Sequence, residues 1–548
     1  MPVSPIPASD VPTADQQPAG YSPKGCARRE IHPACETRSG VPMTTKPHAS
    51  LKPNSWEFET EALIKPTGFR EYDARWWFGH PGSDKAPDLN LYGVQALGAG
   101  LGTLIHELGV APKIVVGHDF RSYSLSVKQA LEVGLMSAGI EVHDIGLALS
   151  PTAYYAQFDL DIPCVAMVTA SHNSNGWTGV KMGANRPLTF GPDEMSRLKE
   201  IVLSGSAKTR SGGGYVRQAG VAERYLDDVA KDVAIKRPLK VVAACGNGTA
   251  GAFAPQALRA MGVEVVEMDC ELDHTFPRYN PNPEDMKMLH AMRDAVLEHG
   301  ADVGLGFDGD GDRCGVIDNE GEEIFADKIG LMLARDLAPL HPGASFVVDV
   351  KSTGLFAIDP VLAEHGCKTD YYKTGHSYIK RRSKELGALA GFEKSGHFFL
   401  QPPIGRGYDD GLVAARAVLQ MLERNPDKTM ADLRRDLPMS YGSPTMSPAC
   451  ADEEKYGVVE KIVERFQARK TNGEAVAGRA ITDVNTVNGV RFSLEGGAWG
   501  LVRASSNTPN LVVVVESPNS HEEVVSVFQA IETVLAGCPE VGEFDQKL

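Results

Sequence analysis

One segment of the sequence spaces three carboxylates in a way that suits a metal ion. Asp308, Asp310 and Asp312 alternate with Gly309 and Gly311 directly after the apolar run VGLGF. Side chains at alternate positions of an extended segment point to one side, and the glycines let the backbone bend around a hard cation. Three protein ligands leave coordination positions open, as a Mg²⁺ ion that also binds phosphate oxygen requires. The segment therefore predicts a magnesium site.

Two other interpretations of this segment compete with the magnesium site. An EF-hand loop begins similarly, but its sixth position is Arg313 here instead of glycine, and its twelfth is Asn319 instead of glutamate. An acidic turn without a metal is the second alternative. Three carboxylates packed so closely repel one another without a cation, which favours the bound ion.

A serine loop follows the apolar run CVAMV and reads Thr169-Ala-Ser171-His172-Asn173. A serine at the end of a strand can present its hydroxyl, His172 can hydrogen-bond nearby, and Lys181 can neutralise an attached phosphate. Without an adjacent base such a serine is a poor nucleophile unless metal or phosphate electrostatics activate it. The alternative is a turn in which serine and asparagine cap a following helix.

The segment GFEKSGH lies between two expected strands, ALA and FFL. Glu393 and Ser395 offer acceptors and donors for sugar hydroxyls, and His397, with an ordinary pKa near ~6.5, can shuttle protons. A hairpin with a surface glutamate and a hydrogen-bonded histidine is the alternative.

A fourth segment, Arg503-Ala-Ser505-Ser506-Asn507-Thr508-Pro509, lies between WGLV and LVVVV. Hydroxyls, an amide and backbone N–H groups around one arginine make an anion cradle, whereas a plain turn is the alternative. The shorter segments FREYDAR (69–75) and KTGHS (373–377) carry little weight alone.

The elements that position these loops repeat along the chain. KIVVG (113–117), KVVAA (240–244) and SFVVD (345–349) are each followed by a polar loop, a helical stretch, a glycine and a second strand. This pattern predicts βαβ units in three similar α/β domains with mixed sheets. Alternating strands and a closing helix after about residue 437 predict a smaller α+β domain. We expect the four domains to surround a central cleft.

These patterns give predicted boundaries: an N-terminal extension, three α/β domains and a fourth domain, at 1–55, 56–210, 211–320, 321–437 and 438–548. The extension holds ten of the 35 prolines and almost no apolar periodicity, which predicts disorder. The alternative is that the protein begins at Met43.

Composition excludes several classes of partner. A net charge of −16 argues against nucleic-acid binding, so anions must bind in local pockets of Arg, Lys and backbone N–H. The sequence has no apolar run long enough to span a bilayer, and no basic stretch leads into an apolar one at its N-terminus. We therefore expect no membrane span and no secretory signal. Nine dispersed cysteines without a CxxC pair argue against disulfides and zinc, and indicate the reducing cytoplasm.

Taken in order, six segments resemble the α-D-phosphohexomutase superfamily, specifically bacterial phosphomannomutase/phosphoglucomutase. They are FREYDAR, TASHN…GVK, FDGDGDR, KTGHS, the SGH loop and NGVRFSLEGGAWGLVRASSNTP, and the likeness runs from about Trp56 to the C-terminus. The resemblance implies reversible phosphoryl transfer between the 6- and 1-positions of mannose or glucose phosphate. It implies a phosphorylated Ser171 and a hexose 1,6-bisphosphate intermediate.

The resemblance also implies a role for each site residue. The phosphate of Ser171 and the carboxylates of Asp308, Asp310 and Asp312 would hold Mg²⁺. Catalytic groups around the phosphoryl would be Ser171, His172, Lys181, Arg75, Arg313 and His397, with the acid–base choice between Lys181 and His397 open. Sugar or phosphate would contact Tyr72, Lys351, Thr374, Gly375, His376, Glu393, Ser395, Arg503, Ser505, Ser506, Asn507 and Thr508.

Three departures from the family pattern stand out, and the one at Lys394 bears on the sugar preference. The serine loop continues NSNGWTG, the phosphate loop reads Ser506-Asn507-Thr508, and Lys394 stands in FEKSGH where EMSGH is usual. A phosphoglucosamine mutase is therefore the near alternative, and a metal-dependent sugar phosphatase or a non-catalytic sugar-phosphate sensor the more distant ones. The expected partner is a small sugar phosphate, with no nucleic acid or membrane, and the protein a monomer or homodimer.

Overall fold

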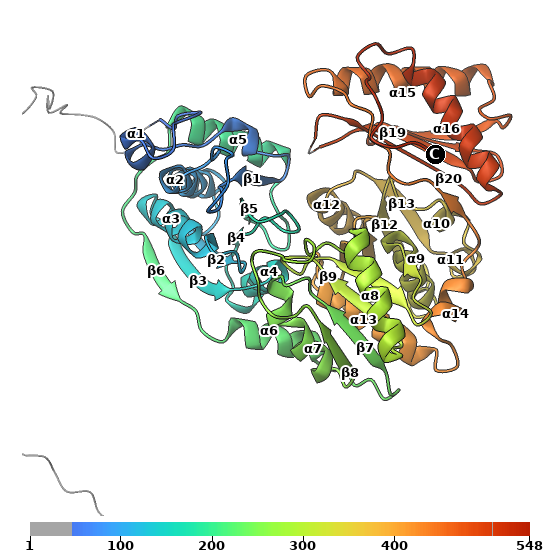
Figure 1. Ribbon diagram of the computed structural model, residues 1–548, viewed down its shortest axis with the longest axis horizontal. Helices are drawn as coiled ribbons and strands as arrows, with labels where there is room; N and C mark the ends of the chain where they lie inside the picture. Colours follow the sequence, from blue (N-terminus) through green and yellow to red (C-terminus); the bar gives the residue numbers. More distant parts are fainter. Residues whose placement is uncertain (1–45, 507) are drawn as a thin grey trace, which may run out of the picture. The chain divides into compact units, whose positions relative to one another are not determined.

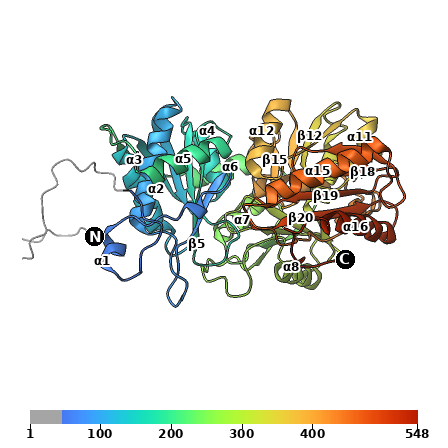
Figure 2. The same ribbon diagram turned by 90° about the horizontal axis from the view of Figure 1, so that it is seen from above.

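The computed structural model describes residues 46–506 and 508–548, which form four sheets in succession along the chain (Figure 1). The first three sheets mix parallel and antiparallel pairs, and the fourth is antiparallel throughout. The predicted class, three α/β domains and a smaller α+β domain, is therefore confirmed. The second view shows helices on both faces of the first sheet (Figure 2).

The first sheet has the order β1-β5-β4-β2-β3-β6. Its strands are β1 (Asp73–Trp77), β2 (Lys113–His118), β3 (Glu141–Leu147), β4 (Cys164–Val168), β5 (Trp177–Gly183) and β6 (Gly214–Arg217). Its helices are α2 (Leu91–Glu107), α3 (Ser124–Ser137), α4 (Ser150–Asp159) and α5 (Pro192–Ser204), preceded by α1 (Trp56–Thr60) and the 3₁₀ turn η1 (Pro66–Gly68). The serine loop joins β4 to β5, the antiparallel pair beside the parallel core.

The second sheet has the order β11-β10-β9-β7-β8. Its strands are β7 (Lys240–Ala244), β8 (Glu264–Met268), β9 (Val303–Phe307), β10 (Cys314–Asp318) and β11 (Glu323–Ile324). Its helices are α6 (Val221–Ala230), η2 (Thr249–Ala252), α7 (Ala254–Ala260) and α8 (Met286–His299). The triple-aspartate loop is the β9–β10 connection.

The third sheet has the order β13-β12-β14-β15. Its strands are β12 (Ser345–Asp349), β13 (Lys368–Tyr372), β14 (Ala390–Phe392) and β15 (Phe398–Leu400). Its helices are α9 (Ala326–Leu337), α10 (Leu355–Ile358), α11 (Pro360–Glu364), α12 (His376–Leu386), α13 (Gly411–Arg424) and α14 (Met430–Arg435). The sugar-loop segment is the tight β14–β15 connection, as the sequence predicts.

The fourth sheet has the order β16-β20-β19-β18-β17. Its strands are β16 (Tyr441–Gly442), β17 (Ile481–Asn485), β18 (Val490–Leu494), β19 (Trp499–Ala504) and β20 (Leu511–Ser517), and its helices are α15 (Lys455–Asn472) and α16 (His521–Leu535). The anion-cradle segment connects β19 to β20.

The hydrophobic core shows how the domains are joined. One continuous cluster of buried side chains includes Val115 of the first sheet, Val241 of the second and Phe346 of the third. The fourth domain has its own core and meets the third through a small cluster around Val350 and Trp499. Among the described residues, no helix is long and apolar enough to cross a membrane.

Three predicted domain boundaries differ from the pairing of the strands. β6 pairs with β3 beyond residue 210, and β11 pairs with β10 beyond residue 320. Both are short edge strands, too brief to give a periodic signal. Within the predicted extension 1–55, residues 1–45 lie outside the described part of the chain, but His48 already forms a bridge with Leu63.

Candidate active site

The triple-aspartate loop is buried and rich in unpaired oxygens. Asp308, Asp310 and Asp312 have no exposed surface, and each offers a carboxylate oxygen within 4.8 Å of the others. Oδ1 of Asp310 and Oδ1 of Asp312 have no hydrogen-bond donor among the described residues. Burial, together with the two neighbouring carboxylates, raises the pKa of Asp308 to about 8. Three converging carboxylates with oxygens to spare fit a hard divalent cation.

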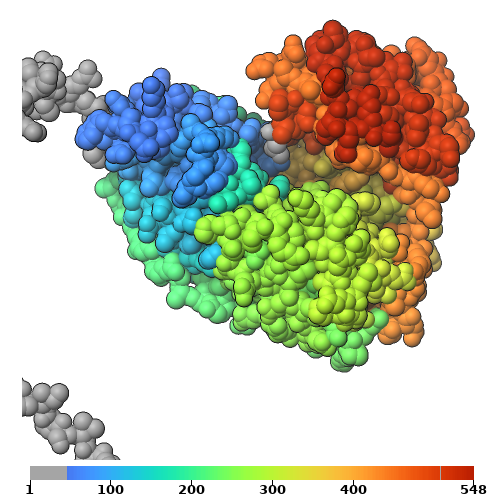
Figure 3. Space-filling view, viewed as in Figure 1, coloured from blue at the N-terminus to red at the C-terminus, as the bar shows by residue number. Residues whose placement is uncertain are grey.

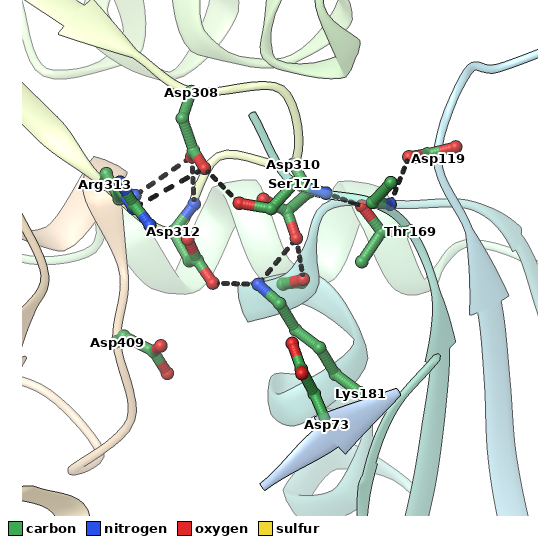
Figure 4. Close-up of polar contacts among 12 residues, drawn as sticks. Asp73, Asp119, Thr169, Ser171, Lys181, Asp308, Asp310, Asp312, Arg313 and Asp409 are labelled. Carbon is green, nitrogen blue, oxygen red and sulfur yellow. Dashed lines mark hydrogen bonds and ion pairs between the residues drawn. The ribbon is translucent and has the colours of Figure 1, made fainter. Parts of the chain in front are cut away.

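Ser171 lies directly against this loop. Its Oγ donates a hydrogen bond of 2.8 Å to Oδ2 of Asp308 and lies 3.2 Å from Nδ1 of His172. Its backbone has φ = 51°, in the left-handed region that non-glycine residues rarely adopt. The Arg121 guanidinium holds this turn by donating to the Ser171 carbonyl at 3.0 Å. The strained turn aims the hydroxyl at the carboxylates (Figure 4).

Lys181 supplies positive charge to the same carboxylates. From β5 its buried ammonium donates to Oδ2 of Asp310 at 2.7 Å and contacts Asp312 (Figure 4). Ser150 donates to the same Asp310 oxygen at 2.6 Å. Burial alone would raise the pKa of Asp310, but the Lys181 ammonium and the Ser150 hydroxyl hold it well below its usual range.

Arg313 and His397 connect the second and third domains. Nε of Arg313 lies 3.1 Å from Nε2 of His397, and Nδ1 of His397 lies 3.2 Å from Oδ2 of Asp409. Burial lowers the pKa of His397, but the carboxylates of Asp312 and Asp409 raise it further, so the net shift is upward. Arg313 also donates to Glu284 at 3.2 Å.

The first domain contributes a further arginine and an aromatic ring. Arg75 donates to Oδ2 of Asp73 at 3.0 Å and to the Ala170 carbonyl at 2.6 Å, which fixes it beside the serine loop. The Tyr72 ring meets the His376 ring edge-on, with centroids 4.7 Å apart. The residue directly before β1 thus contacts the third domain.

The third and fourth domains present groups that suit hydroxyls and an anion. Oε1 of Glu393 accepts from the Gly375 N–H at 2.9 Å, while its buried Oε2 has no hydrogen-bond donor among the described residues. Arg503 donates to the Ala504 carbonyl at 2.8 Å, and its buried Nε has no acceptor among those residues. Thr508 hydrogen-bonds Ser505 through their hydroxyls at 2.7 Å.

Most of the predicted site residues line one cavity of about 550 Å³, to which all four domains contribute. The surface is hollowed between the first domain, in blue, and the fourth, in red (Figure 3). The predicted residues in its wall are Tyr72, Arg75, Ser171, His172, Lys181, Arg313, Lys351, Thr374, His376, Glu393, Ser395, His397, Arg503, Ser505, Ser506 and Thr508. Gly375 contributes its N–H to Glu393 from behind the wall, and Asn507 lies outside the described residues.

Several residues of the site were not predicted. Arg70, Asp73, Asn173, Trp177 and Glu284 also line the cavity. Arg70 and Asp73 belong to the FREYDAR segment, so the sequence could have indicated them. No motif lies near Glu284.

Asp409 was missed for a different reason. It precedes Asp410, which caps helix α13 by accepting from the Leu412 and Val413 N–H groups. Capping alone explains a pair of aspartates before a helix. The contact of Asp409 with His397 therefore leaves no pattern in the sequence.

Comparison with known proteins identifies the family. Four family models, described as phosphoglucomutase/phosphomannomutase alpha/beta/alpha domains I, II and III and C-terminal domain, match residues 67–209, 223–321, 325–441 and 449–534. The chain therefore belongs to the phosphoglucomutase/phosphomannomutase family, and the resemblance inferred from the sequence is confirmed.

Individual relatives agree with this assignment. A phosphomannomutase/phosphoglucomutase of Pseudomonas syringae is 35% identical over 421 residues, covering 76% of this chain and 86% of that protein. A phosphoglucomutase of Neisseria meningitidis is 31% identical over 466 residues, covering 84% and 96%. The crystal structure of a family member from Burkholderia thailandensis superposes with a TM-score of 0.76 at 28% identity, covering 88% and 99%.

Proposed function

We propose that this protein is a magnesium-dependent phosphohexomutase that moves phosphate between the 6- and 1-positions of mannose or glucose phosphate. The observation that carries the proposal is the 2.8 Å hydrogen bond between the Ser171 hydroxyl and Asp308, across the boundary of two domains. A metal ion held by Asp308, Asp310 and Asp312 would activate a serine there electrostatically, and Nδ1 of His172 lies 3.2 Å from the same hydroxyl.

In the proposed reaction Ser171 carries the phosphoryl group between turnovers. The oxygen of the free sugar hydroxyl attacks phosphorus, the bond from phosphorus to the serine oxygen breaks, and the hydroxyl proton passes to a base. The product is the 1,6-bisphosphate, which turns end for end and returns its other phosphate to the serine. The base is His397 or Lys181. Asp310 and Asp312 accept hydrogen bonds from the Lys181 ammonium and hold its proton, which favours His397.

The surrounding cations have separate tasks in this scheme. Arg75, Lys181 and Arg313 lie around Ser171, where they would stabilise charge on the phosphoryl oxygens during transfer. Asp308, Asp310 and Asp312, with the phosphate of Ser171, would hold Mg²⁺, which supplies further stabilisation of that charge.

The far side of the cavity would hold the substrate in two opposite orientations. Arg503 and the Ser505–Thr508 loop would bind the phosphate that is not reacting, with Tyr72 beside them. Glu393 and Ser395 would contact sugar hydroxyls common to both orientations, together with Lys351, Thr374, Gly375 and His376. A buried Glu393 oxygen without a donor supports this role, because such an oxygen is costly unless a ligand hydroxyl satisfies it.

The remaining expectations form part of the same proposal. We place the enzyme in the cytoplasm as a monomer or homodimer, without nucleic acid or membrane partners. We also propose four domains, with the first extended through β6 and the second through β11. A phosphoglucosamine mutase is the second candidate, and product assays on the three hexose phosphates separate the two.

Intact mass spectrometry tests the central step. Purified protein should carry one phosphate, about 80 Da, that maps to Ser171. Ser171→Ala should lose turnover but retain sugar-phosphate binding in calorimetry. Full turnover by this variant would contradict the scheme, and net release of inorganic phosphate would instead indicate a phosphatase.

A further inference from the structure

Two free cysteines lie side by side at the carboxyl edge of the second sheet. Cys245 directly follows β7 and Cys270 comes two residues after β8, and these strands pair in parallel. Their Sγ atoms are 3.6 Å apart. A disulfide requires a separation of about 2.05 Å, so closing the pair needs only a modest movement of the two loops.

The two thiols differ in access and in acidity. Cys245 is fully buried, whereas Cys270 is half-buried and hydrogen-bonds the Ala243 carbonyl at 3.3 Å. The hydrogen bond with Cys245 lowers the pKa of the Cys270 thiol although burial opposes this, and the pKa of Cys245 is raised. Because Cys270 is the more accessible of the two, an oxidant reaches it first, and the buried Cys245 beside it is placed to resolve the oxidised sulfur.

The loop that begins at Cys245 supports the metal loop. Its Thr249 N–H donates to the Gly309 carbonyl at 3.0 Å, and a Cβ on Gly248 would lie 3.0 Å from the Gly309 Cα. A Cβ on Gly309 would in turn lie 2.4 Å from the Ser171 carbonyl oxygen. Close backbone contacts therefore run from Cys245 to Ser171 with little space between them.

We propose that Cys245 and Cys270 form a peroxide-reactive dithiol whose closure to a disulfide lowers turnover at the neighbouring site. The Cys270 thiolate attacks hydrogen peroxide, the O–O bond breaks, and the leaving hydroxide takes a proton to form water. Cys245 then attacks the sulfenic sulfur, the S–S bond forms, and the S–O bond breaks to release a second water. Hydrogen peroxide is reduced by two electrons in the first step alone, the sulfenic acid is the oxidant in the second, and the two thiols lose two electrons overall.

The chemistry around the pair favours a neutral oxidant. Beside the larger effects of the Cys245–Cys270 hydrogen bond and of burial, the negative charges of Glu267 and Asp269 act to raise the pKa of both thiols. They would repel glutathione disulfide, which is anionic at neutral pH, but not hydrogen peroxide.

The test exposes the full chain to hydrogen peroxide, then measures both the disulfide and turnover. Peptide mapping should recover a Cys245–Cys270 disulfide, and turnover should fall by about tenfold to a hundredfold, because a displacement of about 1 Å near reacting groups costs that much. Dithiothreitol should restore turnover. Glutathione disulfide at the same concentration should react more slowly.

Variants make the outcome decisive. Cys270→Ser should keep the basal turnover and lose the sensitivity to peroxide, and Cys245→Ala should do the same. Cys367→Ser, at a half-buried cysteine of the third domain, and the double variant Cys26→Ser/Cys35→Ser should remain sensitive.

The effect on turnover rests on the proposed mutase function, whereas the disulfide is measured by mass and does not. An inactive reduced protein that still forms the disulfide would therefore count against the mutase function alone. No Cys245–Cys270 disulfide, a disulfide without loss of turnover in an active enzyme, an equally sensitive Cys270→Ser, or equally fast reaction with glutathione disulfide would each overturn the inference.

Discussion

Gly309 offers a direct test of whether the first two domains must meet closely for turnover. It lies between two of the clustered aspartates, and a Cβ at this position would be 2.4 Å from the Ser171 carbonyl oxygen and 3.3 Å from Pro281. The Ser171 contact is to backbone and the Pro281 contact is to a rigid ring carbon, so no flexible side chain can yield. Gly309→Ala must therefore push the serine loop and the metal loop apart.

The size of the displacement follows from this contact. The loops must separate by at least about 0.6 Å before the new contact reaches 3.0 Å, the closest that real Cβ atoms show. The same displacement would stretch the 2.8 Å bond from Ser171 to Asp308 toward the limit of a hydrogen bond. A misplacement of about 1 Å costs up to about a hundredfold in rate, so we expect kcat to fall by about tenfold to a hundredfold. This corresponds to about 1.4–2.7 kcal/mol.

The assay follows conversion of glucose 1-phosphate to glucose 6-phosphate through a coupled dehydrogenase, with melting temperature recorded in parallel. Overpacking costs about 1–3 kcal/mol of stability, so the variant should remain folded with a slightly lower melting temperature. KM should change little, because most of the proposed substrate contacts lie in the third and fourth domains. Gly457→Ala in helix α15 is the matched control, since its Cβ meets nothing within 4 Å. A Gly309→Ala enzyme with kcat within twofold of the parent would refute the reasoning.

Three further predictions concern the cation, the far phosphate and the domain contact. Chelation with EDTA should lower turnover by more than about a hundredfold and added Mg²⁺ should restore it; activity that survives chelation would exclude the metal role. Arg503→Lys should raise KM by about tenfold with kcat nearly unchanged in steady-state kinetics, because lysine cannot form the bidentate contact; a loss confined to kcat would place Arg503 at the transferring phosphate instead. Glu516 joins the fourth domain to Thr353 and Gly354 of the third, each at 2.7 Å, and although burial opposes it, Lys328 and these hydrogen bonds lower the pKa of Glu516 from 4.5 to about 2. The ionised Glu516 therefore stabilises the fold above about pH 4.5, and this stabilisation is lost as the pH falls toward 2. Glu516→Gln should lower the free energy of unfolding by about 3 kcal/mol at pH 7 and by little near pH 2, measured by thermal unfolding across pH. An equal loss at both pH values would contradict this.

The repeated pattern of strands was enough to predict the fold class. KIVVG, KVVAA and SFVVD correspond to β2, β7 and β12, each an interior strand of a mixed sheet. The serine, metal and sugar segments follow β4, β9 and β14, which pair in parallel with β2, β7 and β12 respectively. Because loops from separate sheets face one cavity, the residues that the resemblance singled out lie together.

What could not be predicted depends on contacts between distant segments. Asp409 approaches His397 only after helix α13 has packed against the second and third domains, and its neighbour's capping role hides it. Arg121 holds the turn at Ser171 from a loop that reads as an ordinary polar connection. Short edge strands such as β6 gain their pairing from the sheet and carry no periodicity of their own.

The distribution of paired and unpaired charge divides the cavity into two ends. Around Ser171, Arg75 is paired with Asp73 and Lys181 with Asp310, so their positive charge is already balanced. At the opposite end, Arg503 has no carboxylate within ion-pair distance among the described residues. A sugar bisphosphate therefore meets one end whose cations are already paired with carboxylates, where a divalent cation would add positive charge. At the other end it meets the unpaired positive charge of Arg503. Such an asymmetry would hold one phosphate firmly while the other is transferred, in a protein whose net charge of −16 otherwise repels the ligand.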